Sequence, residues 1–161
     1  MSAADRWARV RQGAARYERL FWIGAIAAVL IVQWPMVKGL YYRTADAPPE
    51  SSRIEWRTDL DAALAESRRT GRPVLADFSA DWCPPCIAMQ HDVWPDDRVE
   101  QAVIGGYVPL VIDVDRDMEA SGRYGVRAIP TILVLDGDGR VLRRATFLSA
   151  SGMREFLAPA P

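Results

Sequence analysis

The chain has 161 residues, which is enough for one domain with a buried core and too few for two. Its formal net charge of −1 excludes the concentrated basic surface that nucleic-acid binding requires, so we expect no nucleic-acid partner. The charge is unevenly distributed, because residues 1–43 hold 7 Lys and Arg against 2 Asp and Glu, whereas residues 44–161 hold 13 against 19.

The amino-terminal region combines a basic head, residues 1–19, with an uncharged segment. That segment, "LFWIGAIAAVLIVQWPMV" at residues 20–37, would span roughly 27 Å as a helix, just enough to cross a bilayer. It predicts a single transmembrane anchor over residues 20–40. Five arginines precede it, so the positive-inside rule places the amino terminus in the cytoplasm and the remainder in the periplasm or outside the cell.

A cleaved secretory signal peptide is the alternative interpretation of this region. The sequence "ADA" at residues 45–47 has the small-x-small pattern of a cleavage site. The apolar run is longer than a usual signal-peptide core, and Pro48 would follow the cut, so we favour an uncleaved anchor in the cytoplasmic membrane. The polar, proline-bearing residues 41–53 predict an extended linker, and the folded domain is expected over residues 54–158.

The first part of this domain predicts a helix and a buried strand. Thr58 and Asp61 resemble a helix-capping start, and the amphipathic segment that follows ends at Gly71. The apolar run "PVLADFS", residues 73–79, is typical of a central strand that is buried on both faces. A turn with two cysteines follows directly.

Helices and strands then alternate along the rest of the chain, and a hairpin comes late. The expected elements are helices at 84–91, 96–106, 117–126 and 149–158, and strands at 107–115, 130–136 and 140–147. This order predicts an α/β layered structure with a sheet of mixed strand directions.

The stretch "ADWCPPCIAM", residues 80–89, holds the only two cysteines, Cys83 and Cys86. A structural disulfide that closes so short a loop removes little entropy from the unfolded chain. A structural zinc site needs four ligands, and the chain offers two cysteines and one histidine, so we expect no metal. Covalent haem attachment requires C-x-x-C-H, but Ile87 follows the second cysteine.

Redox chemistry remains, and the spacing suits it. Cys83 lies just before a helix, where free N–H groups and the helix dipole favour its thiolate. Cys86 lies one turn further on and can close the disulfide ring. Pro84 and Pro85 supply no N–H, so the Cys83 thiolate keeps mainly the amide of Cys86 as a donor. A less stabilised thiolate makes the couple more reducing.

Two motifs resemble the thioredoxin family. "DFSADWCPPC" is similar to its active-site strand and turn, and "YGVRAIPTILVLDGDGRV" is similar to its later segment with a cis-proline. The match covers residues 54–158 and looks most like the carboxy-terminal thioredoxin-like domain of DsbD-type reductases and their small membrane-tethered relatives. The resemblance implies a thioredoxin fold, a central mixed sheet flanked by helices, preceded here by the transmembrane helix.

The resemblance also implies roles for individual residues. Cys83 would be the attacking thiol and Cys86 the resolving one. Asp77 falls where the family places a buried carboxylate, whose charged form is disfavoured by desolvation and which can exchange a proton with Cys86.

Three further residues would contact the substrate. Pro130 would be the cis-proline that faces the sulfurs, the backbone of Ile129 would pair with an extended substrate segment, and Trp82 would shield one side of the cysteines. Three positions depart from thioredoxin itself. Val111 replaces a lysine that pairs with the buried aspartate, Thr146 replaces a glycine near the docking groove, and Ser79 replaces the usual aromatic residue. These changes favour a dedicated partner.

The first functional hypothesis is therefore a membrane-anchored thiol:disulfide oxidoreductase that reduces disulfides of exported proteins, with cytochrome c maturation as one assignment. It would need a membrane or periplasmic thiol as electron donor and no cofactor. The alternative is a tethered Cu(I)-binding module that uses Cys83, Cys86 and Met89, although such proteins generally have wider cysteine spacing and a distant histidine. A third possibility, a chaperone-like holder, would tolerate loss of both cysteines.

Overall fold

The computed structural model describes residues 3–45 and 51–158, and for residues 3–16 it describes the helix but not the side chains. Residues 46–50 of the predicted linker, and with them most of the "ADA" motif, lie outside the described residues. The chain divides into two compact units, Met1–Pro35 and Met36–Pro161.

The predicted single transmembrane helix is wrong in one respect, because the segment forms two helices. Helix α1 covers Ala3–Val32, and α2 covers Trp34–Thr44. Pro35 explains the break, since its ring lacks an N–H and clashes with the carbonyl four residues earlier. No single helix among the described residues is long and apolar enough to cross a membrane; α1 from Tyr17 and α2 meet that criterion only as a bent pair. Helix α2 also includes residues 41–44, which were expected to be extended.

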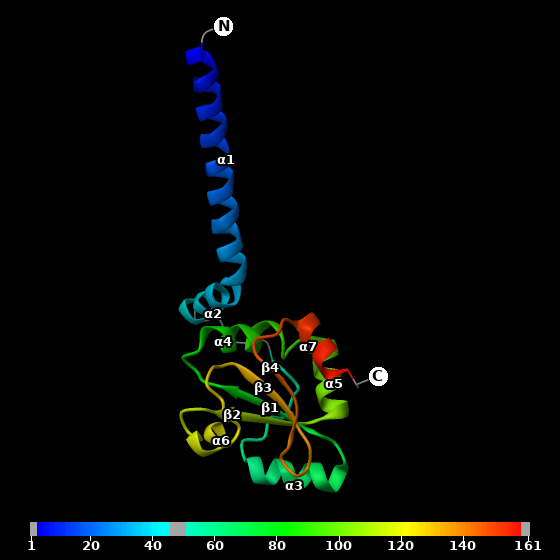
Figure 1. Ribbon diagram of the computed structural model, residues 1–161. Coiled ribbons are helices and arrows are strands. Elements are labelled where there is room, and N and C mark those ends of the chain that lie inside the picture. Colours follow the sequence, from blue (N-terminus) through cyan, green and yellow to red (C-terminus); the bar gives the residue numbers. More distant parts are fainter. Residues whose placement is uncertain (1–2, 46–50, 159–161) are drawn as a thin grey trace. The chain divides into compact units, whose positions relative to one another are not determined.

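The second unit contains a four-stranded sheet of mixed direction, as the sequence predicted (Figure 1). Its order is β2-β1-β3-β4. Strand β1 pairs in parallel with β2 and antiparallel with β3, which also pairs antiparallel with β4. The strands are Val74–Ser79 (β1), Val108–Asp113 (β2), Thr131–Leu135 (β3) and Val141–Ala145 (β4).

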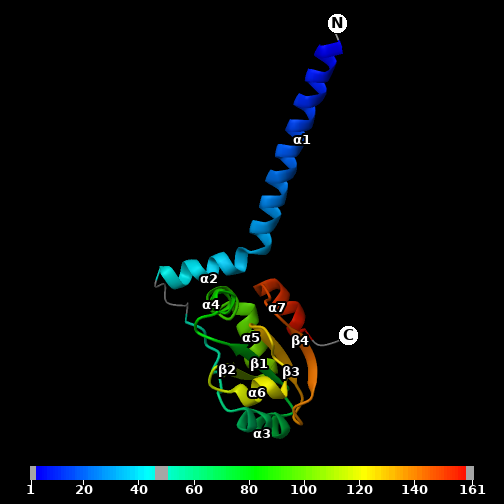
Figure 2. The same cartoon turned by 60° about the vertical axis from the view of Figure 1, so that its left-hand side comes forward.

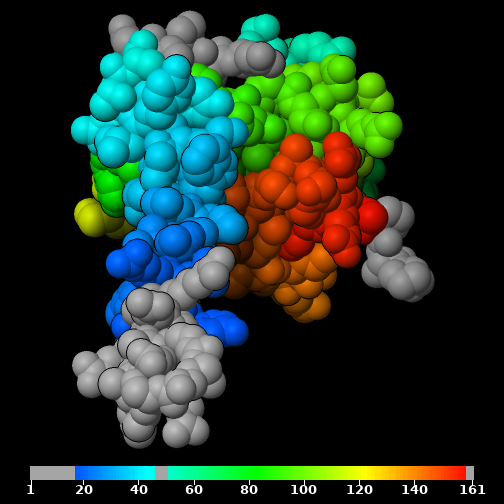
Figure 3. Space-filling view, turned by 90° about the horizontal axis from the view of Figure 1, so that it is seen from above, coloured from blue at the N-terminus to red at the C-terminus, as the bar shows by residue number. Residues whose placement is uncertain are grey.

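Helices cover both faces of this sheet (Figures 1 and 2). They are α3 (Leu60–Thr70) and α6 (Met118–Arg123) on one face, and α4 (Pro84–Asp92), α5 (Asp97–Gly106) and α7 (Ala150–Leu157) on the other. Helices α5 and α7 pack together, and their surfaces adjoin in Figure 3. Successive residues of β1 alternate between the two faces, so Leu75 lies in the core under α4 and Phe78 in the core under α3. The side chain of Asp77 points to the same face of the sheet as that of Leu75.

Capping residues define both ends of α3. Asp59, not Thr58, is the N-cap, and its side chain accepts a hydrogen bond from the amide of Ala62. The predicted cap was wrong by one residue. Gly71 ends the helix in the left-handed conformation, with φ of 72°, as expected for a residue without a Cβ.

Candidate active site

The two cysteines form a disulfide at the start of α4. Their S–S distance is 2.10 Å and their Cα atoms are 5.3 Å apart. Cys83 is the N-cap of α4, and its Sγ accepts a hydrogen bond of 3.3 Å from the amide of Cys86. Pro84 and Pro85 occupy the first two helical positions, where the free N–H groups would otherwise be. The donor predicted from the sequence is therefore the one that the structure supplies.

A small apolar cluster surrounds the disulfide. Both cysteines are buried and pack with Ala80, against the half-buried side chains of Val114 and Ile129. The Ile129–Pro130 peptide bond is cis. The substrate-binding roles of these two residues stay predictions.

Trp82, the residue before Cys83, is 56% exposed. Its indole Nε1 donates a hydrogen bond of 2.6 Å to Oδ2 of Asp115, just beyond the end of β2. This bond holds the ring at the edge of the cysteine turn. The sequence had given no role to Asp115, because it lies 33 residues away from the tryptophan in the chain.

Asp77 is a buried carboxyl group with one hydrogen-bond donor. Trp94 donates from Nε1 to Oδ2 of Asp77 over 3.2 Å, and Oδ1 has no hydrogen-bond partner among the described residues. Burial raises the pKa of Asp77 to about 7, and the hydrogen bond from Trp94 opposes that rise. Val111 stands directly opposite Asp77 on β2, and Ile132 stands opposite on β3, so neither neighbouring strand offers a charge there.

Helix α2 contacts the cysteine turn, which the sequence did not predict. Gly39 is buried against the carbonyl group of Pro84, so closely that a Cβ atom at position 39 would overlap that carbonyl. The Arg43 guanidinium donates to the Trp82 carbonyl over 3.4 Å. Only a glycine permits so close an approach between the two backbones.

Helix α2 also contacts the carboxy-terminal end of α4. Lys38 Nζ lies 2.6 Å from Oδ2 of Asp92, and the Tyr42 hydroxyl donates to Oδ1 of the same carboxylate over 2.9 Å. The Tyr42 ring stacks on His91, with ring centroids 4.0 Å apart. His91 and Asp92 therefore pair with α2 and not with the cysteines.

The geometry does not favour the copper alternative. Met89 is buried in the core cluster between α4 and the sheet, and the cysteines belong to a separate cluster. In the part of the chain that the structure describes, no group of three His, Cys, Asp or Glu side chains could hold a metal ion.

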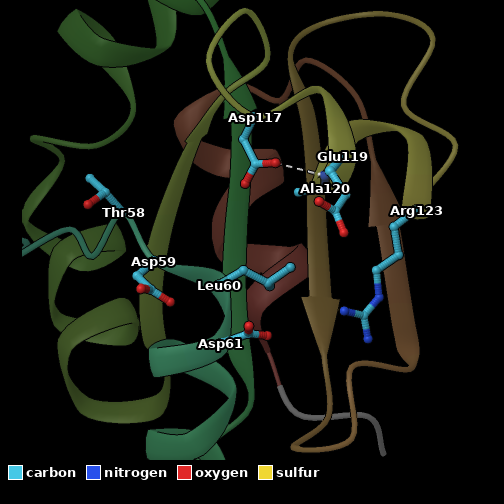
Figure 4. A pocket seen from close by; sticks show the side chains of 8 residues that line it. All are labelled: Thr58, Asp59, Leu60, Asp61, Asp117, Glu119, Ala120 and Arg123. Carbon is cyan, nitrogen blue, oxygen red and sulfur yellow. Dashed lines mark hydrogen bonds between the residues drawn. The ribbon is translucent and has the colours of Figure 1, made fainter.

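One further pocket lies away from these residues (Figure 4). Helix starts form much of its wall, and Asp117 is fixed there because it accepts a hydrogen bond from the amide of Ala120. Its lining residues are Thr58, Asp59, Leu60, Asp61, Asp117, Glu119, Ala120 and Arg123. None of them is a predicted site residue, and none is a cysteine.

Comparison with known proteins decides the family. A family described as thioredoxin-like matches residues 55–137, about half of the chain. The chain belongs to the thioredoxin-like family. This result confirms the resemblance seen in the sequence, and with the C-x-x-C disulfide it makes the protein a thiol:disulfide oxidoreductase of thioredoxin type.

Individual relatives of this thioredoxin-like protein point to the DsbD type. It is 34% identical over 151 residues to thiol:disulfide interchange protein DsbD 1 of Pseudomonas aeruginosa, a match that covers 86% of this chain and 25% of that protein. The chain thus spans about a quarter of the length of such relatives. It is 42% identical over 69 residues to thioredoxin of Bacillus subtilis, covering 43% of this chain and 62% of that one.

A solved structure gives the same assignment. The oxidised carboxy-terminal domain of DsbD from Neisseria meningitidis is 27% identical, with a TM-score of 0.53, and the match covers 63% of this chain and 95% of that domain. The thioredoxin-like unit therefore aligns with nearly the whole of that DsbD domain.

Proposed function

We propose that this thioredoxin-like protein is a membrane-anchored reductant of disulfides in exported proteins. The observation that carries the proposal is the position of Cys83, at the N-cap of α4 with the Cys86 amide aimed at its sulfur. A thiolate at that position is stabilised by a hydrogen bond and by the helix dipole, and it can attack a substrate disulfide.

The reaction transfers two electrons from the protein to the substrate. The Cys83 thiolate attacks one sulfur of the substrate disulfide, so a mixed disulfide forms and the other substrate sulfur leaves as a thiolate. Cys86 then attacks Sγ of Cys83, which forms the disulfide of the present structure and releases the second substrate thiol. A membrane or periplasmic thiol donor must return the two electrons before the next cycle.

Asp77 supplies the proton chemistry in this proposal. Cys86 is a better nucleophile without its proton, and the carboxylate of Asp77 takes that proton during the second step. A carboxyl group with a pKa of about 7 is suited to this exchange near neutral pH. With Val111 opposite Asp77, the proton exchange proceeds without the lysine that thioredoxin has there.

The direction of electron flow follows from the two prolines. Because Pro84 and Pro85 remove two amide donors from the first turn of α4, the Cys83 thiolate is less stabilised than at an ordinary helix start. We expect a reduction potential near that of thioredoxin, about −270 mV, and far from that of the oxidant DsbA, about −120 mV. Equilibration of the full chain with glutathione buffers measures it, and a value near that of DsbA would contradict the reductant role.

Anchoring through the apolar segment, residues 20–37, completes the proposal. Its support is the charge-free sequence after a basic head, together with large side chains such as Phe21, Ile23 and Ile31 that are mostly exposed on α1. The domain would then face the periplasm or the exterior, where apocytochrome c is one candidate substrate. A reporter that is active only outside the cytoplasm, fused after residue 50, should give a signal. A soluble product that lacks residues 1–47 would contradict anchoring.

The decisive experiment traps the reaction intermediate. In cells, Cys86→Ser should accumulate mixed disulfides between Cys83 and exported proteins, because the resolving thiol is missing. Cys83→Ser is the matched control and should trap none. Non-reducing electrophoresis followed by mass spectrometry identifies the captured partners. Equal trapping by both variants, or full function of both in cells, would overturn the proposal.

A further inference from the structure

Among the described residues, one hydrogen-bond donor reaches Asp77, and its position distinguishes the two carboxyl oxygens. Trp94 lies just after the end of α4, the helix whose first turn contains Cys86, and its Nε1 reaches Oδ2 of Asp77 over 3.2 Å. An indole N–H donates and never accepts. In a neutral carboxylic acid the carbonyl oxygen is a better acceptor than the hydroxyl oxygen, so the donor at Oδ2 favours the proton of the neutral acid on Oδ1.

The indole is held firmly in this position. The backbone amide of Trp94 donates to the Met89 carbonyl over 3.1 Å, and its carbonyl accepts from the Ser52 hydroxyl over 3.3 Å. The ring packs edge-on against Trp56, with centroids 5.0 Å apart, and it is buried with Val93 in the core under α4. Rotation of the indole away from the carboxyl group would disrupt this packing.

Among the described residues, no other charged group interacts with the Asp77 carboxyl group. Its neighbours on β2 and β3 are Val111 and Ile132, and burial and Trp94 are the two causes of its altered pKa. The remaining charged or titratable groups of the elements on this face of the sheet are engaged elsewhere or exposed. On α4, His91 and Asp92 pair with α2; on α5, Glu100 pairs with Arg53; on α7, Arg154 pairs with Asp96.

We propose that Trp94 is a positioning residue for the resolving step: its N–H fixes Oδ2 of Asp77 and leaves Oδ1 as the atom that exchanges a proton with Cys86. The inference rests on the proposed role of Asp77. The hydrogen bond also favours the carboxylate, so Trp94 keeps Asp77 a working base at neutral pH against the effect of burial.

The test uses the full chain in detergent and the variant Trp94→Phe, which keeps an aromatic ring and removes the donor. NMR of isotope-labelled aspartate follows the titration of the Asp77 carboxyl group. We expect its midpoint to move upward by about one pH unit, since one hydrogen bond to the charged form is lost. Trp56→Phe is the matched control, because it makes the same change in the same aromatic pair without touching Asp77.

Kinetics give a second readout. The reduced chain reacts with the chromogenic disulfide of thionitrobenzoate, which releases one chromophore when Cys83 attacks and the second when Cys86 resolves the mixed disulfide. In Trp94→Phe the second release should be about fivefold slower at pH 7 and recover above about pH 8.5, the profile of a base with a higher pKa. The first release should be unchanged, and Trp56→Phe should resemble the unaltered chain.

The outcomes separate the inference from the function on which it rests. An unchanged Asp77 midpoint in Trp94→Phe overturns the inference alone. If Asp77→Asn leaves the second release unaltered at every pH, the proposed role of Asp77 fails. A measurement on the unaltered chain avoids any misfolding of a variant. The Trp94 indole resonance should titrate with the Asp77 midpoint, and that of Trp56 should not. A Trp94 resonance that is constant with pH also overturns the inference.

Discussion

Two buried carboxyl groups of this protein have opposite electrostatics. Asp77 on β1 is 5% exposed and Glu100 on α5 is 2% exposed. Burial raises the pKa of Asp77 to about 7, with only Trp94 opposing it. Burial acts in the same direction on Glu100, yet hydrogen bonds from the backbone and guanidinium of Arg53, and from Ser52, together lower its pKa.

The difference lies in the partners and not in the depth of burial. Glu100 receives the Arg53 amide at 2.6 Å and Nε at 2.7 Å, so both of its oxygens bind a donor and one donor is charged. These hydrogen bonds attach Arg53, at the start of the folded domain, to α5. Among the described residues Asp77 has one neutral donor and one oxygen without a partner, so it can gain and lose a proton at neutral pH. One carboxylate is structural, and the other has the properties of a proton-transfer group.

The largest expected effect comes from Asp77→Asn. The folded state binds the Asp77 proton more tightly than the unfolded chain, so the free energy of unfolding falls as pH rises from about 4 to about 7. The variant should remove this fall and be more stable than the unaltered chain by up to about 4 kcal/mol at pH 8, and by little at pH 4. Urea unfolding at several pH values measures it. Equal stability of the two chains at pH 8 would show that Asp77 is not held in an unfavourable charged state.

Glu100→Gln should act in the opposite direction. Loss of the charged partner of Arg53 should destabilise the fold by about 2 kcal/mol at neutral pH, and the partly exposed guanidinium limits the cost. Because the pKa of Glu100 is lowered by folding, this difference should shrink as pH falls through its range. The same urea series provides the measurement, and the rate of disulfide exchange should not change. A variant more stable than the unaltered chain would contradict the structural role.

Val111→Lys is designed to make the Asp77 site resemble that of Glu100. Val111 is half-buried and stands opposite Asp77 on β2, so a lysine there can place its ammonium near the carboxylate. The pKa of Asp77 should fall by about one unit. Titration by NMR of labelled aspartate measures this, with Val114→Lys, on the loop after β2, as the control. An unchanged or raised midpoint in Val111→Lys would show that the two positions do not interact.

The smallest effect is expected at Asp92, a carboxylate that water still reaches. Asp92 and Lys38 side chains are both 34% exposed, so Asp92→Asn should cost less than about 1 kcal/mol of stability. The variant should loosen α2 from α4 and speed alkylation of reduced Cys83 by about twofold, since Gly39 lies against the next residue, Pro84. Arg72→Ala, which removes the ion pair with Glu66, is the control and should leave the alkylation rate unchanged. An unaltered rate in Asp92→Asn would show that α2 does not limit access to Cys83.

The sequence by itself determined the features that depend on short separations along the chain. The three-residue spacing places Cys83 at the N-cap and Cys86 in the first turn, and the two prolines leave the Cys86 amide as the donor, whatever packs around them. The apolar run of β1, which is buried on both faces, places Asp77 in the core, and two motifs in the right order identify the family.

Only the tertiary structure decided the contacts between distant segments. Trp94 reaches Asp77 across 17 positions, and Lys38 reaches Asp92 across 54. No local pattern encodes such pairs, because side-chain packing against a particular sheet face selects them after the elements have formed. The sequence therefore located the cysteine pair, whereas the fold determined which side chains lie next to Asp77.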